Sequence, residues 1–362
     1  MITPKAHIAA TAPYALPEVN VAADKPLVML AFNESARPPS PLAVKAGYEA
    51  LASAQLYSDT EWTDLREAIA QIYRIAASQV LCGAGSMELI SCLTQCYVGP
   101  GDRVLSSQYG YAFFRSAAHA AGADYDQAPE RDLSVSVDAL LASVRDSTRI
   151  VFLANPGNPT GTRIRQDELV RLRDGLDDDI LLVIDEAYGE FADGLDESSF
   201  DLVSRGNTVV LRTFSKAYGL AGLRVGWGLF PPSIADEIRK LLNPGNIGVV
   251  SQNAATAATL DQPYMRATCA ETVDRRDRFA GQMRELGLRV PESFTNFVLI
   301  RFPNADAAGR ADQVLRAEGI MLRNMVGYNL PDCLRATIGS ESDMEIVTEH
   351  LSDWRRREGV QC

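Results

Sequence analysis

Lys216 stands at the end of an apolar run, NTVVLRTFSK, among small and hydroxylic neighbours. A lysine amine becomes a nucleophile when burial or a nearby cation lowers its pKa. Arg224, a few residues further along, is either such a cation or a binding group for an anion. Taken alone, Lys216 would be read as a surface lysine, so its interpretation depends on the other polar residues of the chain.

Two further segments place polar side chains after apolar runs. Asp185 ends the run DILLVID and is either a helix cap or the partner of a cation. Tyr188 follows within one helical turn. The loop NPGNPTG at 155–161 is rich in turn formers, and Asn158 within it carries an amide that can donate to a phenolate-like oxygen.

The fourth segment, GAGSMELI at 83–90, is a glycine-rich turn that opens a helix. Its free backbone N–H groups and the helix dipole can bind a phosphate, although a plain strand-to-helix turn has the same appearance. Together the four segments supply a phosphate site, a lysine for a Schiff base, a carboxylate for a pyridinium nitrogen and donors for a ring hydroxyl. That combination suits pyridoxal phosphate.

The segments that carry these residues follow one pattern, an apolar run followed by polar or Gly-rich residues and then a helix. Continuous apolar runs are typical of strands buried on both faces, and their alternation with helices predicts a mostly parallel sheet. Ligands bind such sheets at the carboxyl ends of the strands. We therefore expect one pocket to collect these residues: Ser86, Tyr111, Asn158, Asp185, Tyr188 and Lys216.

The pattern changes after residue 245 and predicts a smaller α+β domain. Its expected elements are a long helix over 251–287, a strand over 289–302, a helix over 311–319, strands over 320–325 and 333–339, and a helix that ends near 359. The chain is thus expected to divide into an N-terminal arm (1–35) near the substrate and the dimer interface, a large cofactor-binding domain (36–245) and a small C-terminal domain (246–362).

Composition narrows the function classes. The chain has 362 residues, 46% of them hydrophobic, which is enough for two domains with a sizeable core and argues against disorder. A net charge of −12 argues against nucleic-acid binding, which needs a basic face. No apolar stretch predicts a signal peptide or a membrane span. With three histidines and no CxxC pair, a metal site is not expected, and the cytoplasm is the expected location.

The sequence resembles the fold-type I, class I/II aminotransferases, and within them the histidinol-phosphate aminotransferase group. The most specific segments are ANPGNPTG, VIDEAYGEF and LRTFSKAYGLAGLRVG, and the resemblance extends from APY and NESARPPSP to LPDCLRATIG. It implies an α/β fold, with a mostly parallel seven-stranded-type sheet between helices and a smaller α+β C-terminal domain. It also implies a homodimer with shared active sites.

The resemblance assigns roles to individual residues around pyridoxal 5'-phosphate. Lys216 would form the internal aldimine, Asp185 would pair with the pyridine nitrogen, and Tyr188 with Asn158 would bind the ring hydroxyl. Tyr111 would stack on the ring. The cofactor phosphate would be held by a larger set: Gly85, Ser86, Met87, Thr213, Ser215, Arg224 and, from the other subunit, Tyr57.

On the substrate side, the resemblance implies that Arg335 binds the acidic group of the substrate with help from Arg323, while Tyr14 and Asn33 lie close by. The implied reaction is a ping-pong transamination between an amino acid or histidinol phosphate and a 2-oxo acid, in which the freed amine of Lys216 moves the Cα proton. Lys216, Asp185 and Tyr188 would be the catalytic residues. The implied pathway is histidine biosynthesis.

Departures from the family pattern fall near the substrate. The N-terminal motif reads Asn33-Glu34-Ser35-Ala36, followed by Arg37, which is either a substrate-facing cation or an exposed arginine. An aromatic or other amino-acid aminotransferase, or a lyase similar to threonine-phosphate decarboxylase, is therefore an alternative. A cofactor-binding transcriptional regulator would need an added basic domain. An inactive binding protein fits poorly with the intact Lys216 and Asp185.

Overall fold

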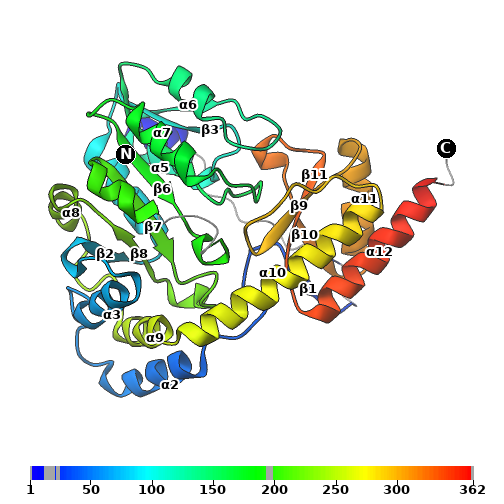
Figure 1. The fold of residues 1–362 in the computed structure, drawn as a ribbon, viewed down its shortest axis with the longest axis horizontal. Coiled ribbons are helices and arrows are strands. Elements are labelled where there is room, and N and C mark those ends of the chain that lie inside the picture. Colours follow the sequence, from blue (N-terminus) through cyan, green and yellow to red (C-terminus); the bar gives the residue numbers. More distant parts are fainter. Residues whose placement is uncertain (1, 12–20, 22–24, 193–198, 360–362) are drawn as a thin grey trace.

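The computed structural model describes residues 2–11, 21, 25–192 and 199–359, which form two sheets and the helices around them (Figure 1). The larger sheet has seven strands in the order β2-β8-β7-β6-β5-β3-β4. Their bounds are Val80–Gly83 (β2), Gly226–Leu229 (β8), Thr208–Thr213 (β7), Leu181–Asp185 (β6), Thr148–Ala154 (β5), Arg103–Ser107 (β3) and Asp124–Ala128 (β4). All neighbouring pairs are parallel except those that β8 makes with β2 and β7, so the sheet is mostly parallel as predicted.

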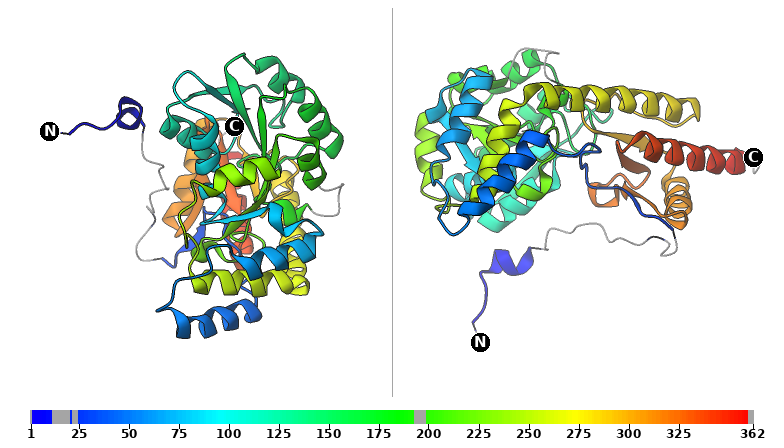
Figure 2. Two further views of the ribbon diagram at one scale, coloured as in Figure 1. Left: turned by 90° about the vertical axis from the view of Figure 1, so that its left-hand side faces the viewer. Right: turned by 90° about the horizontal axis from the view of Figure 1, so that it is seen from below.

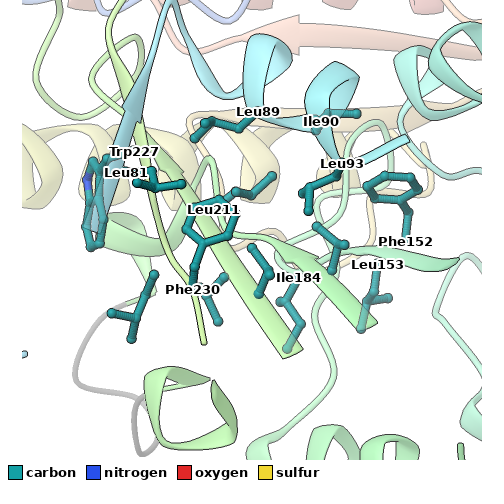
Figure 3. Packing of buried hydrophobic residues seen from close by; sticks show 14 of the residues in the cluster. Leu81, Leu89, Ile90, Leu93, Phe152, Leu153, Ile184, Leu211, Trp227 and Phe230 are labelled. Carbon is teal, nitrogen blue, oxygen red and sulfur yellow. The ribbon is translucent and has the colours of Figure 1, made fainter. Parts of the chain in front are cut away.

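Helices cover this sheet on both faces, and as a result every residue of β6 and β7 is buried. The helices of this part of the chain are α2 (Pro41–Ala50), which packs on a further helix rather than on the sheet, α3 (Thr63–Tyr73), α4 (Ser86–Tyr97), α5 (Ala112–Ala121), α6 (Val137–Ser143), α7 (Gln166–Asp174) and α8 (Pro232–Arg239). Figure 3 shows the apolar residues of α4, such as Leu89 and Leu93, in one cluster with strand residues such as Leu211 and Phe152. This packing fixes the start of α4 at the edge of the sheet where the strands end.

The smaller sheet has four strands in the order β1-β10-β11-β9, and its outermost strand comes from the N-terminal part of the chain. Its members are Val28–Leu30 (β1), Ile320–Asn324 (β10), Cys333–Thr337 (β11) and Phe297–Arg301 (β9). β1 pairs parallel to β10, and the other pairs are antiparallel. The residues that follow β1 are thereby held between the two sheets.

Three helices complete the C-terminal part: α10 (Gln262–Glu285), α11 (Ala305–Ala317) and α12 (Glu341–Gly359). Figure 2 shows α10 and α12 alongside each other, and they are in contact. The N-terminal helix α1 (Ala6–Ala10) contacts α5. No helix within the described ranges has the length and apolar character needed to cross a membrane.

Three predicted elements differ from the structure. The helix expected over 311–319 is α11, which begins at Ala305 because Asn304 caps it there by accepting from the Ala307 N–H. The long helix expected over 251–287 is two helices, α9 (Val249–Leu260) and α10, because Asp261 leaves helical geometry (ψ 58°) and its side chain caps α10 by accepting from the Tyr264 N–H. The strand expected over 289–302 is ordered as β9 only from Phe297, and Arg289 makes an isolated bridge to Arg301. The proline and polar residues before Phe297 offer no alternation that would continue a strand.

The division into three units at 35 and 245 stays a prediction. Helix α9, which that division assigns to the C-terminal domain, contacts α2 and α3. Helix α10 contacts β9 and α12. The chain therefore passes from the part that holds the seven-stranded sheet to the part that holds the four-stranded sheet along α9 and α10.

Candidate active site

A cavity of about 660 Å³ lies at the carboxyl ends of the central strands of the larger sheet, on the side that faces the smaller sheet. The loops after β5, β6 and β7 reach it from one side, and residues 31–34 with the smaller sheet reach it from the other. Thirteen residues singled out from the sequence line this cavity: Asn33, Ser86, Met87, Tyr111, Asn158, Asp185, Tyr188, Thr213, Ser215, Lys216, Arg224, Arg323 and Arg335. The six residues expected to converge from separate strand ends are all among them.

Lys216 follows β7, and its amine is held by backbone oxygens from the opposite side of the cavity. Nζ donates to the carbonyls of Phe32 and Asn33 at 3.1 and 2.9 Å. Burial, and after it the positive charge of Arg335, lowers the pKa of Lys216 to about 7, with Arg224 acting in the same direction. A substantial fraction of this amine is therefore neutral near pH 7, as a nucleophile or a proton acceptor requires.

Asp185 is the last residue of β6, and only 4% of its surface is exposed. Its Oδ1 accepts from the backbone N–H of Ala187 at 3.1 Å. Burial raises the pKa of Asp185 to about 7, whereas that hydrogen bond and the charge of Lys216 lower it. Asp185 caps a turn rather than a helix, and the charge of Lys216 influences its carboxyl group inside the cavity. A cation facing this carboxyl group inside the cavity would stabilise its ionised form.

The glycine-rich turn and the segment after β7 form a polar cradle at one end of the cavity. Gly85 is the N-cap of α4 with φ 79°, and a Cβ there would overlap the guanidinium of Arg224. Arg224 donates to Ser215 Oγ at 3.3 Å, and Thr213 Oγ1 donates to the same oxygen at 3.0 Å. Free N–H groups at a helix start, two hydroxyls and an arginine together suit a phosphate dianion.

Tyr188 and Asn158 face the middle of the cavity. The Tyr188 hydroxyl accepts from Asn33 Nδ2 at 2.8 Å, and burial raises the pKa of Tyr188 above its usual range. Asn158 Oδ1 accepts from Arg335 at 2.5 Å, which leaves the amide N–H groups of Asn158 as donors. Tyr111 is the N-cap residue of α5 and packs edge to face on Phe114, with the ring centroids 5.6 Å apart.

Two arginines close the far side of the cavity from the smaller sheet. Arg335 on β11 and Arg323 on β10 are paired across the antiparallel ladder, so their side chains start from adjacent positions. Arg335 also donates to the carbonyl of Ala31 at 3.0 Å, and its Nε is buried with no hydrogen-bond partner among the described residues. A buried N–H without a partner is costly, so this donor favours an anionic ligand.

Comparisons with known proteins identify the family. Residues 25–351 match the family Aminotransferase class I and II. The chain belongs to this family. It is 40% identical to a histidinol-phosphate aminotransferase of Ruegeria sp. (strain TM1040) over 98% of both chains, and 45% identical to one of Paramagnetospirillum magneticum over 91% of this chain and 92% of that one.

A solved structure of histidinol-phosphate aminotransferase from Sinorhizobium meliloti in complex with pyridoxal-5'-phosphate superimposes with a TM-score of 0.86. The two sequences are 29% identical, and the match covers 91% of each chain. The family and the fold class inferred from the sequence are therefore confirmed for this aminotransferase.

Among the residues singled out from the sequence, Tyr57 and Arg37 do not line the cavity of this aminotransferase, and Tyr14 lies outside the described residues. Tyr57 is fully exposed to solvent, at a distance from the lining residues. Arg37 forms an ion pair with Glu271 (2.9 Å) and lies over the ring of Tyr264, with 4.3 Å from Cζ to the centroid. Of the two readings of Arg37, the geometry favours the surface one.

Sequence reasoning missed several residues that shape the cavity of this aminotransferase. Glu34 and Tyr328 line it. Asn296 and Thr337 lie behind it and bind the backbone of residues 33 and 34. Asn296 precedes β9 and Thr337 ends β11, so only the pairing of distant segments reveals them. Thr337 stands two residues after Arg335, and strand alternation places both on the same face of β11.

Proposed function

We propose that this chain is a pyridoxal-phosphate-dependent histidinol-phosphate aminotransferase. The observation that carries the proposal is the Lys216 amine, with its pKa lowered to about 7, in a cavity that also holds Asp185 and the phosphate cradle. The names of the curated relatives, at 40–45% identity over most of the chain, support the choice of substrate. An amino acid or histidinol phosphate would donate the amino group, and a 2-oxo acid would accept it.

The residues present fit the cofactor. Thr213, Ser215, Arg224 and the start of α4 at Gly85, Ser86 and Met87 would hold its phosphate. Asp185 would face the ring nitrogen, Asn158 and Tyr188 the ring hydroxyl, and Tyr111 the ring itself. When bound, the cofactor supplies an aldehyde for the amino group and an electron-accepting ring for the Cα carbanion.

Lys216 has two tasks in this proposal. Its amine would hold the cofactor in the resting enzyme. Once freed by the substrate amine, Nζ would hold the proton that leaves the substrate Cα. The nearby carbonyls of Phe32 and Asn33 bind two of the N–H groups of the amine, so its lone pair is directed elsewhere. Asp185 in its ionised form would keep the ring nitrogen protonated.

Arg335 and Arg323 would bind the phosphate of histidinol phosphate or the carboxylate of the 2-oxo acid. Both ligands present a planar or tetrahedral set of anionic oxygens, which guanidinium groups bind through two parallel hydrogen bonds. The buried Nε of Arg335 is the donor that such an anion would satisfy. Asn33 would lie on the same side.

A single-turnover absorbance experiment on the cofactor-loaded enzyme tests the substrate. We expect histidinol phosphate alone to convert one equivalent of bound cofactor per site to its aminated form, with loss of the resting absorbance band. Conversion by phenylalanine, tyrosine or glutamate but not by histidinol phosphate would instead assign another amino donor. Release of carbon dioxide from threonine phosphate without conversion would favour the lyase alternative.

We also propose a homodimer with shared active sites, in the cytoplasm. An exposed apolar surface around α2 supports a second copy as the partner: Leu42, Val44, Tyr48, Leu51, Leu56 and Tyr57. In such a dimer Tyr57 would reach the cofactor phosphate of the other subunit. Sedimentation equilibrium of the wild-type chain and of Leu42→Asp tests the interface, and a wild-type monomer at micromolar concentration would contradict it. The division at residues 35 and 245 is part of the same proposal.

A further inference from the structure

A closed set of hydrogen bonds joins Asn33 to Thr337 behind the cavity. The backbone N–H of Asn33 donates to Thr337 Oγ1 at 2.9 Å, and the Thr337 hydroxyl donates back to Asn33 Oδ1 at 3.2 Å. Both side chains are at most 3% exposed. Thr337 does not itself line the cavity among the described residues, so it can act there only through its neighbours.

This arrangement determines which way the Asn33 amide points. Thr337 Oγ1 already accepts from the Asn33 N–H, so its own proton needs an acceptor, and among the described residues Asn33 Oδ1 takes it. The oxygen of the amide therefore faces Thr337 and the nitrogen faces away from it. The reversed amide would turn two donors toward a hydroxyl and leave the Thr337 proton without this acceptor.

The amide nitrogen of Asn33 in turn donates to the Tyr188 hydroxyl oxygen at 2.8 Å. The hydroxyl thus uses a lone pair toward Asn33, and its own proton must point elsewhere. Tyr188 lines the cavity, and its ring is held edge to face by Phe297, with the centroids 5.2 Å apart. The proton of Tyr188 is therefore available to a group inside the cavity.

We propose that Thr337 is a positioning residue that acts through Asn33 to direct the Tyr188 hydroxyl proton toward the ring oxygen of the bound cofactor. The inference rests on the proposed function, because it assumes pyridoxal phosphate in the cavity. The proposed contact also links the smaller sheet, which carries Arg335, to Tyr188 on the side of the larger sheet. Thr337 follows the substrate-side Arg335 on β11, and both side chains bind the segment 31–33.

The proposal predicts a spectroscopic effect with a definite sign. A hydrogen bond to an ionised group favours its charged form. The ring oxygen carries its full negative charge when the lysine-bound nitrogen next to it has lost its proton. A donor from Tyr188 therefore favours loss of that proton and lowers the pH at which the resting absorbance band changes. If Tyr188 turns its proton away, this pH midpoint rises.

The test is a pH titration of the absorbance of the cofactor-loaded enzyme. In Thr337→Val, which keeps the shape but has no hydroxyl, we expect the midpoint to rise by about half a pH unit. In Thr337→Ser, the matched control, we expect it within about 0.1 unit of the wild type, since serine makes the same bonds. An unchanged midpoint in Thr337→Val would overturn the proposal. If that variant does not fold, Thr337→Cys compared with Thr337→Ser changes only the oxygen to sulfur and tests the same point.

The same substitution made in the variant Tyr188→Phe distinguishes an effect through the Tyr188 hydroxyl from a general displacement of residues 31–34. Tyr188→Phe has no hydroxyl proton to direct, so Thr337→Val should add no further shift in that background. A further shift of equal size would mean that Thr337 acts by another route, and the inference would be wrong. The proposed function fails in a different way, because wild-type enzyme mixed with pyridoxal phosphate would then show no lysine-linked absorbance band at all.

Discussion

The two walls of the active-site cavity are built in different ways. The cofactor wall, defined here as Asn158, Asp185, Tyr188, Lys216 and Arg224, comes from the loops that follow three neighbouring strands of one sheet. The substrate wall, defined as residues 31–34 with Arg323 and Arg335, combines the N-terminal part of the chain with β10 and β11. The first wall rests on a single buried sheet, and the second on contacts between segments about 300 residues apart.

Under the proposed function, the cofactor wall would carry out the chemical step and the substrate wall would recognise the substrate. The cofactor wall carries Lys216 and Asp185, whose pKa values are both moved to about 7. Asp185 is the last residue of β6, and Lys216 follows β7 by three residues. The substrate wall carries Arg323 and Arg335, and Arg335 is attached to residues 31–34 through a hydrogen bond to the carbonyl of Ala31. We therefore expect changes in the cofactor wall to affect the chemical step and changes in the substrate wall to affect substrate affinity.

The largest effect is expected for Lys216→Ala. Loss of the amine removes both the covalent link and the proton acceptor, so turnover should fall by about 10⁴-fold or more. Cofactor binding through the phosphate cradle should persist and can be measured by equilibrium dialysis. Lys240→Ala is the control, because that side chain is 66% exposed and pairs only with Glu237 in the contacts seen. Undiminished transamination by Lys216→Ala would refute the proposed reaction.

Arg335→Lys probes the substrate wall. Lysine keeps the charge but loses the forked donor set, so kcat/KM for the phosphorylated substrate should fall about 100-fold. The effect should appear in KM, while the absorbance of the bound cofactor stays that of the wild type. Arg278→Lys, at an exposed pair with Glu341, controls for the loss of an arginine. If kcat fell instead and KM did not change, the separation between the two walls would not hold.

The sequence predicts the cofactor wall better than the substrate wall. The strand ends of the cofactor wall could be predicted, because each lies in a continuous motif where an apolar run stops at a polar residue. The start of α4 could be predicted from its glycine turn. By contrast, β1, Asn296 and Thr337 depend on pairing between distant segments, which local periodicity does not report. The break at Asp261 was missed because the flanking residues continue a helical pattern on both sides.

The third prediction concerns the stability of the cofactor-free protein against pH. The pKa of Asp185 is raised from 3.8 to about 7, so its stabilising contribution is full below pH 4 and is lost as the pH rises to 7. The pKa of Lys216 is lowered from 10.5 to about 7, so its cost is full below pH 7 and disappears toward pH 10.5. These two groups together therefore give a minimum of stability near neutral pH.

Urea unfolding of the cofactor-free protein between pH 4 and 9 measures this minimum. Asp185→Asn should remove the fall in the free energy of unfolding between pH 4 and 7. Lys216→Met should remove its rise above pH 7. Each change should amount to up to a few kcal/mol. Equal profiles for the wild type and both variants would show that the two groups titrate normally. Burial in the cofactor wall would then carry no electrostatic cost for these two groups.

The smallest effect is expected for Arg37→Ala, which tests where the substrate wall ends. Arg37 comes three residues after Glu34, but its guanidinium pairs with Glu271 and lies over Tyr264 rather than facing the cavity. The pair is partly exposed, at 31% and 55% of the two side chains, so its loss should lower the free energy of unfolding by about 1 kcal/mol or less.

Because Arg37 holds α10 and not the substrate, kcat/KM of Arg37→Ala should stay within about twofold of the wild type. Glu271→Gln breaks the same ion pair from the helix side and should give the same small loss of stability. A tenfold rise in KM in Arg37→Ala, without a matching change in Glu271→Gln, would show that Arg37 turns into the cavity when substrate binds. The substrate wall would then extend along the N-terminal segment beyond Glu34, and the positive charge that selects the substrate would come from three arginines in place of two.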